Sequence, residues 1–428
     1  MKDEGRETPS WRQVQSFQKM LAKAGEKPPA DRDEFKAWLK EHAERELWFF
    51  SRWILGNEYL SLGTFHRQIV CPYLTDYSNS RFKLLMLPMG CLKTTIASRS
   101  IPPHALIQPA AKNIYFPGVK GCNIRTLLVN ENTDKSKENL AYISEHLMEN
   151  KWIYWLWPEI CWQRKKDAKR WTDTEIEVPR TRVIAEPSIT AAGIKTGWVG
   201  RYYDLIVADD ISALQASQDP PLMERAKKVR RTLKTRFSHK ETGIYLGAMT
   251  HWGANDTCVE WRKDLDFEVM VKGIEEPTPA PDGPMMPLWP EKYPAEWIEK
   301  TRKGMDPIEF SLWLMNKPVP SGYTALNWEE LREYTLEVRG DLNHPYEVLV
   351  FSDAPIDEQI LMRHERKMNP AGFRLGKPLS EVYPGKPRKP GKGPEIGWEG
   401  QGGYLLNKYP SLEHPPPNYP NPVRRDAQ

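Results

Sequence analysis

Lys93, Thr94 and Thr95 follow an apolar run, residues 83–87, and a short turn. A nucleotide phosphate site needs three kinds of group: backbone N–H groups aimed at phosphate oxygens, a lysine that reaches the outer phosphates, and a hydroxyl that binds Mg²⁺. Lys93 and Thr94 supply the last two. The apolar run, the turn and the alanine- and isoleucine-containing segment after it therefore predict a strand, a phosphate loop and a helix.

The turn departs from the usual loop pattern G-x-x-x-x-G-K-[ST]. Leu87 and Leu92 occupy the two glycine positions, and Gly90 is the only glycine of the loop. On these residues alone, an ordinary turn is an alternative to a nucleotide site. The residues that we expect around the phosphates are Pro88, Met89, Gly90, Cys91, Leu92, Lys93, Thr94 and Thr95.

Two adjacent carboxylates, Asp209 and Asp210, end a second apolar run at residues 205–208. Such a pair at the end of a buried strand suits the binding of a metal and the polarisation of a water molecule, because buried carboxylates are rare without a partner. The alternative is a loop whose solvated aspartates cap the next helix. The lysine loop upstream lies at a spacing that P-loop NTPases use, which favours the metal-binding interpretation.

Further segments follow one another in an order that is itself informative. They are Thr64–Gln68, Pro88–Thr94, Arg125–Asn132, Ser188–Gly197, Tyr245–Trp252 with Asn255 and Asp256, Leu288–Tyr293, and Phe310–Pro318. Through them, most of residues 45 to 355 resembles the large terminase subunit of tailed bacteriophages, the ATPase that drives DNA into the procapsid. The resemblance implies a P-loop NTPase domain of RecA/ASCE-like type that uses ATP and Mg²⁺.

The resemblance also implies roles for the residues of the expected ATPase site. Lys93 would neutralise the outer phosphates, and Thr94 and Asp209 would hold Mg²⁺. Asp210, where many relatives have glutamate, would orient the attacking water. Because positioning and electrostatics carry phosphoryl transfer, loss of Lys93 or Asp210 is expected to lower the rate by orders of magnitude.

Other roles come from the same resemblance. Gln68 corresponds to the adenine-proximal motif, and Thr250 and His251 correspond to the segment that couples hydrolysis to movement. Met89 stands where the family usually has an arginine. Arg201, just ahead of the acidic strand, is a candidate arginine finger, and a structural ion pair with Asp204 or another carboxylate is the alternative.

Apolar runs alternate with helical patterns between residues 61 and 275, which predicts an α/β domain with a parallel sheet and helices on both faces. Strands ending at Pro88, Asn130, Asp209 and Met249 would present their carboxyl ends to the nucleotide. We expect a flexible leader at 1–30, a helical segment at 31–60, the ATPase domain at 61–275, a linker segment at 276–340, a nuclease remnant at 341–370 and a tail at 371–428.

The C-terminal region resembles the RNase H-like nuclease of the family only at its start. The run 348–355 resembles the nuclease's first strand, with Asp353 as a metal ligand. From Ala371 onward roughly a third of the residues are glycine or proline, which predicts a disordered tail. Since a two-metal nuclease needs several acids on a rigid frame, we expect this domain to be incomplete or absent.

Composition fits a soluble globular protein: 28% of the 428 residues are charged and the net charge is +4. The start lacks a secretory signal, no run is long enough to span a membrane, and the five cysteines show no metal or disulfide spacing. These features favour a reducing cytoplasm. Two basic clusters, 164–170 and 225–236, are candidates for DNA contact, with solvated helix surface as the alternative.

The resemblance implies a motor that hydrolyses ATP to move double-stranded phage DNA through a portal into the procapsid. Its implied partners are the DNA, the portal protein, a small terminase subunit and further copies of the chain in a ring, in the host cytoplasm and without a membrane. Its nuclease activity would be lost or supplied elsewhere. The alternatives are a non-catalytic prophage remnant and a helicase or other P-loop translocase.

Overall fold

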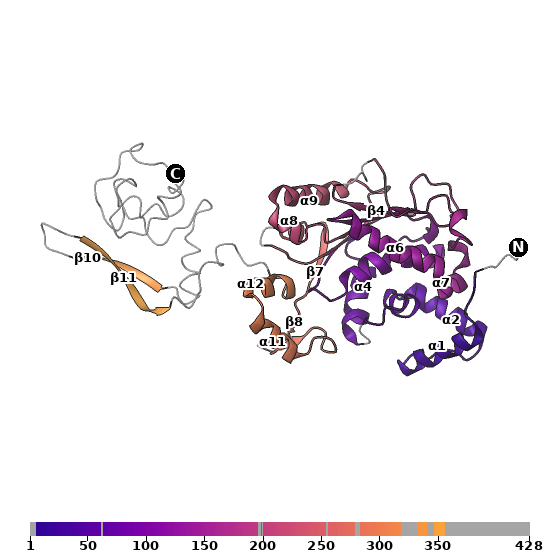
Figure 1. Cartoon of the computed structure of the whole chain (residues 1–428), viewed down its shortest axis with the longest axis horizontal. Coiled ribbons are helices and arrows are strands. Elements are labelled where there is room, and N and C mark those ends of the chain that lie inside the picture. Colours follow the sequence, from indigo (N-terminus) through magenta and orange to yellow (C-terminus); the bar gives the residue numbers. More distant parts are fainter. Residues whose placement is uncertain are drawn as a thin grey trace. The chain divides into compact units, whose positions relative to one another are not determined.

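The computed structural model describes residues 6–60, 63–195, 198, 200–253, 256–278 and 283–317, together with the backbone of two strands further on. Figure 1 shows the elements along the chain. The chain divides into two compact units, residues 1–321 and 322–428. The expected linker, 276–340, crosses this division, and its bounds stay a prediction. Its described part up to residue 317 belongs to the first unit.

The expected flexible leader contains a packed helix, α1 (Trp11–Lys23), so that prediction is wrong for these residues. The side chain of Ser10 accepts a hydrogen bond from the backbone N–H of Gln13, and the side chain of Gln13 accepts one from the backbone N–H of Ser10. These two bonds form a capping box at the start of the helix. Val14, Phe17 and Leu21 recur at helical spacing and are buried. This apolar face attaches the helix to the core in spite of the polar composition around it.

Helices and short helical turns cover much of the first unit. In chain order after α1 they are α2 (Arg32–Arg45), α3 (Leu47–Phe49), η1 (Phe50–Ile54), η2 (Phe65–Val70), α4 (Cys71–Thr75), η3 (Thr95–Ser100), α5 (Ile101–Leu106), η4 (Ala110–Lys112), η5 (Gly121–Asn123), α6 (Thr133–Glu149), α7 (Lys151–Leu156), η6 (Pro158–Ile160), η7 (Lys165–Asp167), α8 (Leu214–Gln218), α9 (Pro220–Leu233), α10 (Thr257–Arg262), α11 (Ala295–Gly304), α12 (Pro307–Glu309) and η8 (Phe310–Leu314). None of the described helices is both long and apolar enough to cross a bilayer.

Among the described residues, seven strands form one sheet in the order β3-β4-β2-β5-β6-β1-β7. They are β1 (Phe82–Met86), β2 (Thr126–Asn130), β3 (Glu175–Ile176), β4 (Ile189–Gly193), β5 (Leu205–Asp209), β6 (Ile244–Met249) and β7 (Phe267–Val271). All neighbours pair in parallel except β3, which runs antiparallel to β4. The predicted α/β architecture, a largely parallel sheet with flanking helices, is confirmed.

Alternating strand residues face two separate hydrophobic cores, as the two-residue period of a strand requires. Leu85 and Leu128 pack in the core that contains the buried faces of α1, α2 and α4 to α7. Their neighbours Leu84 and Leu127 pack in the core formed with α8, α9 and α10. Figure 1 shows α8 and α9 above the sheet and α4, α6 and α7 below it. Both faces of the sheet are therefore covered by helices. A ligand-binding site is then expected at the carboxyl ends of the strands, where open α/β sheets bind ligands.

The segment after β7 folds back toward that edge. β8 (Glu275–Pro277) and β9 (Met285–Pro287) pair antiparallel, and the backbone N–H of Ile274 donates to Leu314 O at 2.7 Å. Trp289, Ile298 and Phe310 are buried in the same core as α1 to α7. The segment is thus an integral part of the first unit.

In the second unit, β10 (Arg332–Arg339) and β11 (Tyr346–Pro355) pair antiparallel. Asp353, the expected nuclease ligand, lies on β11, and its side chain is outside the described residues. The rest of the expected nuclease remnant and the expected disordered tail, 371–428, also lie outside the described part of the chain.

Candidate functional site

Two residues of the loop between β1 and η3 have a left-handed backbone. Gly90 has φ of 78° and Leu92 has φ of 61°. Gly90 tolerates this conformation because it has no Cβ, and the hydroxyl of Tyr293 lies in the space that a Cβ would fill. A leucine in the left-handed region costs about 1–2 kcal/mol. Leu92 therefore adopts, under strain, a conformation that the glycine usual at this position adopts freely.

Lys93 and Asp210 form an ion pair at the carboxyl edge of the sheet, with 3.0 Å between Nζ and Oδ2. Burial disfavours the charged ammonium, but the charges of Asp210 and Asp209 outweigh it, and the pKa of Lys93 lies above its ordinary value. The other carboxylate oxygen of Asp210, Oδ1, is buried without a hydrogen-bond partner among the described residues. One oxygen of Asp210 is thus held by Lys93 and the other is left to accept a proton or a water.

Asp209 receives two hydroxyl groups from the helix that follows the loop. Thr94 donates to Oδ1 at 3.1 Å and Ser98 donates to Oδ2 at 2.8 Å. Burial, together with the adjacent charge of Asp210, raises the pKa of Asp209 to about 6. Mg²⁺ prefers hard oxygen ligands, and a cation here would offset the cost of the buried carboxylate. The donors therefore fit Mg²⁺. Ser98 was missed in the sequence, although its position one turn after Thr94 was a usable signal.

β6 lies between β1 and β5 in the sheet, so the residues after its end lie between the loop and the two acids. Thr250 Oγ1 donates to Leu87 O at 3.1 Å, and the backbone N–H of His251 donates to Asn316 Oδ1 at 3.2 Å. The two residues expected to couple hydrolysis to movement thus connect the start of the loop to the segment after η8. Their coupling role stays a prediction.

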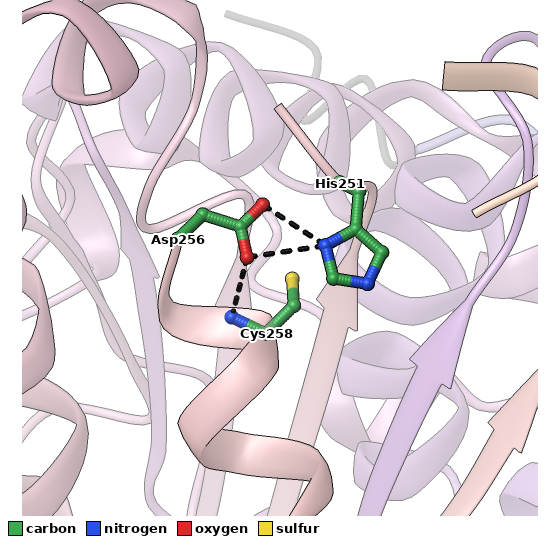
Figure 2. Close-up of side chains that lie close together, drawn as sticks. All are labelled: His251, Asp256 and Cys258. Atoms are coloured by element: carbon green, nitrogen blue, oxygen red, sulfur yellow. Dashed lines mark hydrogen bonds and ion pairs between the residues drawn. The ribbon is translucent and has the colours of Figure 1, made fainter. Parts of the chain in front are cut away.

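His251 belongs to a buried cluster with Asp256 and Cys258 (Figure 2). Its Nδ1 lies 3.2 Å from both carboxylate oxygens of Asp256, which also accept the backbone N–H groups of Trp252 and Cys258. The ligand atoms of the cluster lie within 4.8 Å of one another. Burial and the charge of Asp256 hold the pKa of Cys258 well above its usual value, so the thiol stays protonated. Asp256 therefore caps α10 and orients His251, which is a structural arrangement.

The buried side chain of Glu131 organises the segment after Asp210. The backbone N–H of Glu131 donates to Asp210 O at 3.3 Å. The side-chain Oε1 of Glu131 accepts a hydrogen bond from the backbone N–H of Ala216 in α8 at 2.7 Å. Burial raises the pKa of Glu131. Sequence reasoning placed this residue in a core motif without a role. Its carboxylate ties the end of β2 to the start of α8 beside the acidic pair.

His66, which the sequence analysis did not single out, contacts the loop. Gln68 is exposed on η2. His66 is buried on the same element, and its Nε2 lies 3.3 Å from Cys91 O. Burial lowers the pKa of His66 to about 4, so the ring is neutral at physiological pH. The expected contact of Gln68 with a base stays a prediction.

Arg201, the candidate arginine finger, forms an ion pair with Glu175 of β3. Asp204, which was considered as its partner, pairs instead with Arg125, with 2.9 Å between the charged atoms. In the described chain Arg201 is therefore engaged by a carboxylate, which favours the structural alternative.

Three of the five basic residues of α9 form ion pairs with described residues of the molecule. Lys227 pairs with Glu224, Arg230 with Asp264, and Arg231 with Glu260. Lys234, just after the helix, pairs with Asp264 and Asp266. The positive charge that this helix offers to a DNA backbone is thus smaller than the sequence indicates.

No family model and no curated protein matches the chain. Among solved structures it is similar to the ATPase domain of a large terminase from a Thermus phage, in an arginine-to-alanine variant. The sequence identity is 13%, and the match covers 55% of this chain and 88% of that one. The TM-score is 0.35.

Proposed function

We propose that the first compact unit is a Mg²⁺-dependent ATPase of the P-loop class, with a RecA/ASCE-like arrangement. One observation carries the proposal: Lys93 of the loop contacts Asp210 at 3.0 Å while the hydroxyl of Thr94 contacts Asp209 at 3.1 Å. Two segments far apart in the sequence thereby place an ammonium, a hydroxyl and two carboxylates together at the carboxyl edge of the sheet. These are the groups that phosphoryl transfer from a nucleotide requires.

Each group has a role in the proposed reaction. When ATP binds, the ammonium of Lys93 would contact the outer phosphates and would share its positive charge between them and Asp210. Thr94 and Asp209 would hold Mg²⁺, which when bound neutralises charge on the phosphate oxygens. Asp210, whose Oδ1 lacks a partner among the described residues, would accept a hydrogen bond from the attacking water. The N–H groups of the loop other than those of Met89 and Cys91, which donate to Trp313 O and Pro88 O, would surround the phosphates.

We further propose that ATP hydrolysis drives double-stranded DNA into a procapsid, as in the large terminase subunits that the sequence motifs resemble. The order of those motifs along the chain supports this. The proposed partners are the DNA, a portal protein, a small terminase subunit and neighbouring copies in a ring, in the host cytoplasm. The nuclease step would be lost or supplied elsewhere, and the small segment around β8, β9 and α11 would serve as the linker.

ATP hydrolysis by the full chain, with and without linear duplex DNA, tests both proposals. Lys93→Ala and Asp210→Ala should each abolish turnover, and Lys300→Ala on the exposed side of α11 should not. Stimulation by duplex DNA supports the packaging role. Turnover that Lys93→Ala and Asp210→Ala leave intact contradicts the assigned site. Absence of turnover in the wild type, with DNA present, would mean a non-catalytic protein or a motor that turns over only when assembled on its portal, and nucleotide binding separates these two.

A further inference from the structure

The loop is contacted from outside the sheet by the segment that follows β9. Lys292 Nζ donates to Gly90 O at 2.8 Å, and the ring hydroxyl of Tyr293 lies against the Cα of Gly90. The backbone N–H of Met89 donates to Trp313 O at 3.0 Å. The apex of the loop is thus covered by residues that are more than 200 positions away in the sequence.

The charge of Lys292 is not neutralised by a carboxylate in the described part of the chain. Its ammonium contacts the neutral carbonyl of Gly90 and lies over the ring faces of Trp289, at 4.9 Å, and Tyr293, at 5.1 Å. These faces favour a cation by cation–π attraction and hold it near the loop. Lys93, the lysine within the loop, is by contrast paired with Asp210. The available positive charge at the apex therefore comes from Lys292.

A phosphate would compete well for this ammonium. A hydrogen bond between an ammonium and an anionic oxygen is stronger than one between an ammonium and a neutral carbonyl. Lys292 is exposed and its four-carbon side chain is flexible, so that the exchange of Gly90 O for a phosphate oxygen needs no change in the backbone. Met89, the neighbour of Gly90, brings no charge of its own.

We propose that Lys292 supplies the second positive charge of the phosphate site and contacts the terminal phosphate of a nucleoside triphosphate. This inference rests on the proposed nucleotide site and adds a residue to it. Nucleotide binding would thereby draw on a segment outside the sheet, and the affinity for a triphosphate would depend on that segment being in place.

Three variants of the full chain separate the possibilities. Lys292→Gln removes the charge but keeps a hydrogen-bond donor, Lys292→Arg keeps the charge, and Lys300→Gln removes a lysine from the exposed side of α11. Each is titrated with fluorescently labelled ATP and ADP in the presence of Mg²⁺. Thermal melting curves compare the folding of the variants with that of the wild type.

We expect Lys292→Gln to weaken ATP binding about tenfold or more and ADP binding much less, because a charge-assisted contact to the terminal phosphate is lost. Lys292→Arg should restore most of the ATP affinity, and Lys300→Gln should match the wild type. Unchanged ATP affinity in Lys292→Gln overturns this inference alone. Equal weakening of ATP and ADP also overturns it, since Lys292 would then only hold the loop. A wild-type chain that binds neither nucleotide overturns the proposed site as well.

Discussion

Asp209→Asn should stabilise the metal-free protein while it removes the proposed Mg²⁺ ligand. The carboxylate is fully buried, and burial with the adjacent Asp210 charge raises the pKa of Asp209 to about 6. The difference from the ordinary value of about 4 corresponds to about 3 kcal/mol of cost for the ionised form in the folded chain. Asparagine has the same shape and no charge, and the hydroxyls of Thr94 and Ser98 can rotate to suit its amide.

The effect has a defined dependence on pH. The pKa of Asp209 is higher in the folded chain than in the unfolded chain. The stability that the protonated carboxyl group contributes is therefore fully present below the unfolded-state pKa of about 4, and it is lost as the pH rises through the folded-state pKa of about 6. The gain from Asp209→Asn should therefore approach about 3 kcal/mol at pH 8 and shrink to about 1 kcal/mol at pH 4.5. Asp173→Asn is the control: a hydrogen bond from Lys137 lowers the pKa of Asp173, so its loss should bring no gain.

The assay is urea unfolding in EDTA at both pH values for the wild type and the two variants. At each pH the free energy of unfolding of the wild type is subtracted from that of Asp209→Asn. A larger difference at pH 8 than at pH 4.5 supports the reasoning. Equal destabilisation at both pH values would refute it, because Asp209 would then be held by its hydrogen bonds rather than strained by its charge. Added Mg²⁺ should reduce the difference in free energy of unfolding between Asp209→Asn and the wild type at pH 8, because it would stabilise only the wild type.

Substitutions that test three further local features are measured by urea unfolding. Leu92→Val should destabilise the chain more than Leu92→Gly, because a β-branched residue fits the left-handed backbone worst; the reverse order would mean that the loop does not require this conformation. Gly247→Ala should cost about 1–3 kcal/mol by overpacking, since its Cβ would meet a buried ring, whereas Gly304→Ala, with open space around it, should cost nothing. Ser98→Ala should cost about 1–3 kcal/mol at pH 8 by removing a donor to the buried carboxylate of Asp209, and no loss would contradict that contact.

The strands that position the site could be predicted because each is an apolar run that stops at a polar or turn residue. The runs that stop at Pro88, Asn130, Asp209 and Thr250 correspond to β1, β2, β5 and β6. Parallel strands share a carboxyl edge, so the loop lysine and the acidic pair were expected to lie together. The helix Trp11–Lys23 was missed because its mean composition is polar, although its apolar spacing and its capping residues were visible.

The remaining parts of the site depend on contacts that the local sequence does not encode. Nothing near Lys292 indicates that it reaches Gly90, because the contact depends on how the segment after β9 folds back. The neutralisation of α9 depends likewise on α10 and the turn after it, which bring Glu260 and Asp264 to the helix. His66 and Gln68 lie two positions apart on one helical element, and only packing decides which of them meets the loop.

Mg²⁺-dependent binding of ATP, measured by calorimetry, tests the central claim most directly, because a motor that turns over only when assembled would still bind its nucleotide. We predict that the wild type binds ATP with Mg²⁺ and binds it much more weakly in EDTA. Lys93→Ala should lose at least a hundredfold in affinity, by removal of a buried charged contact, and Lys300→Ala should bind as the wild type does. ATP affinity that survives Lys93→Ala, or a folded wild type that does not bind ATP, would contradict the account.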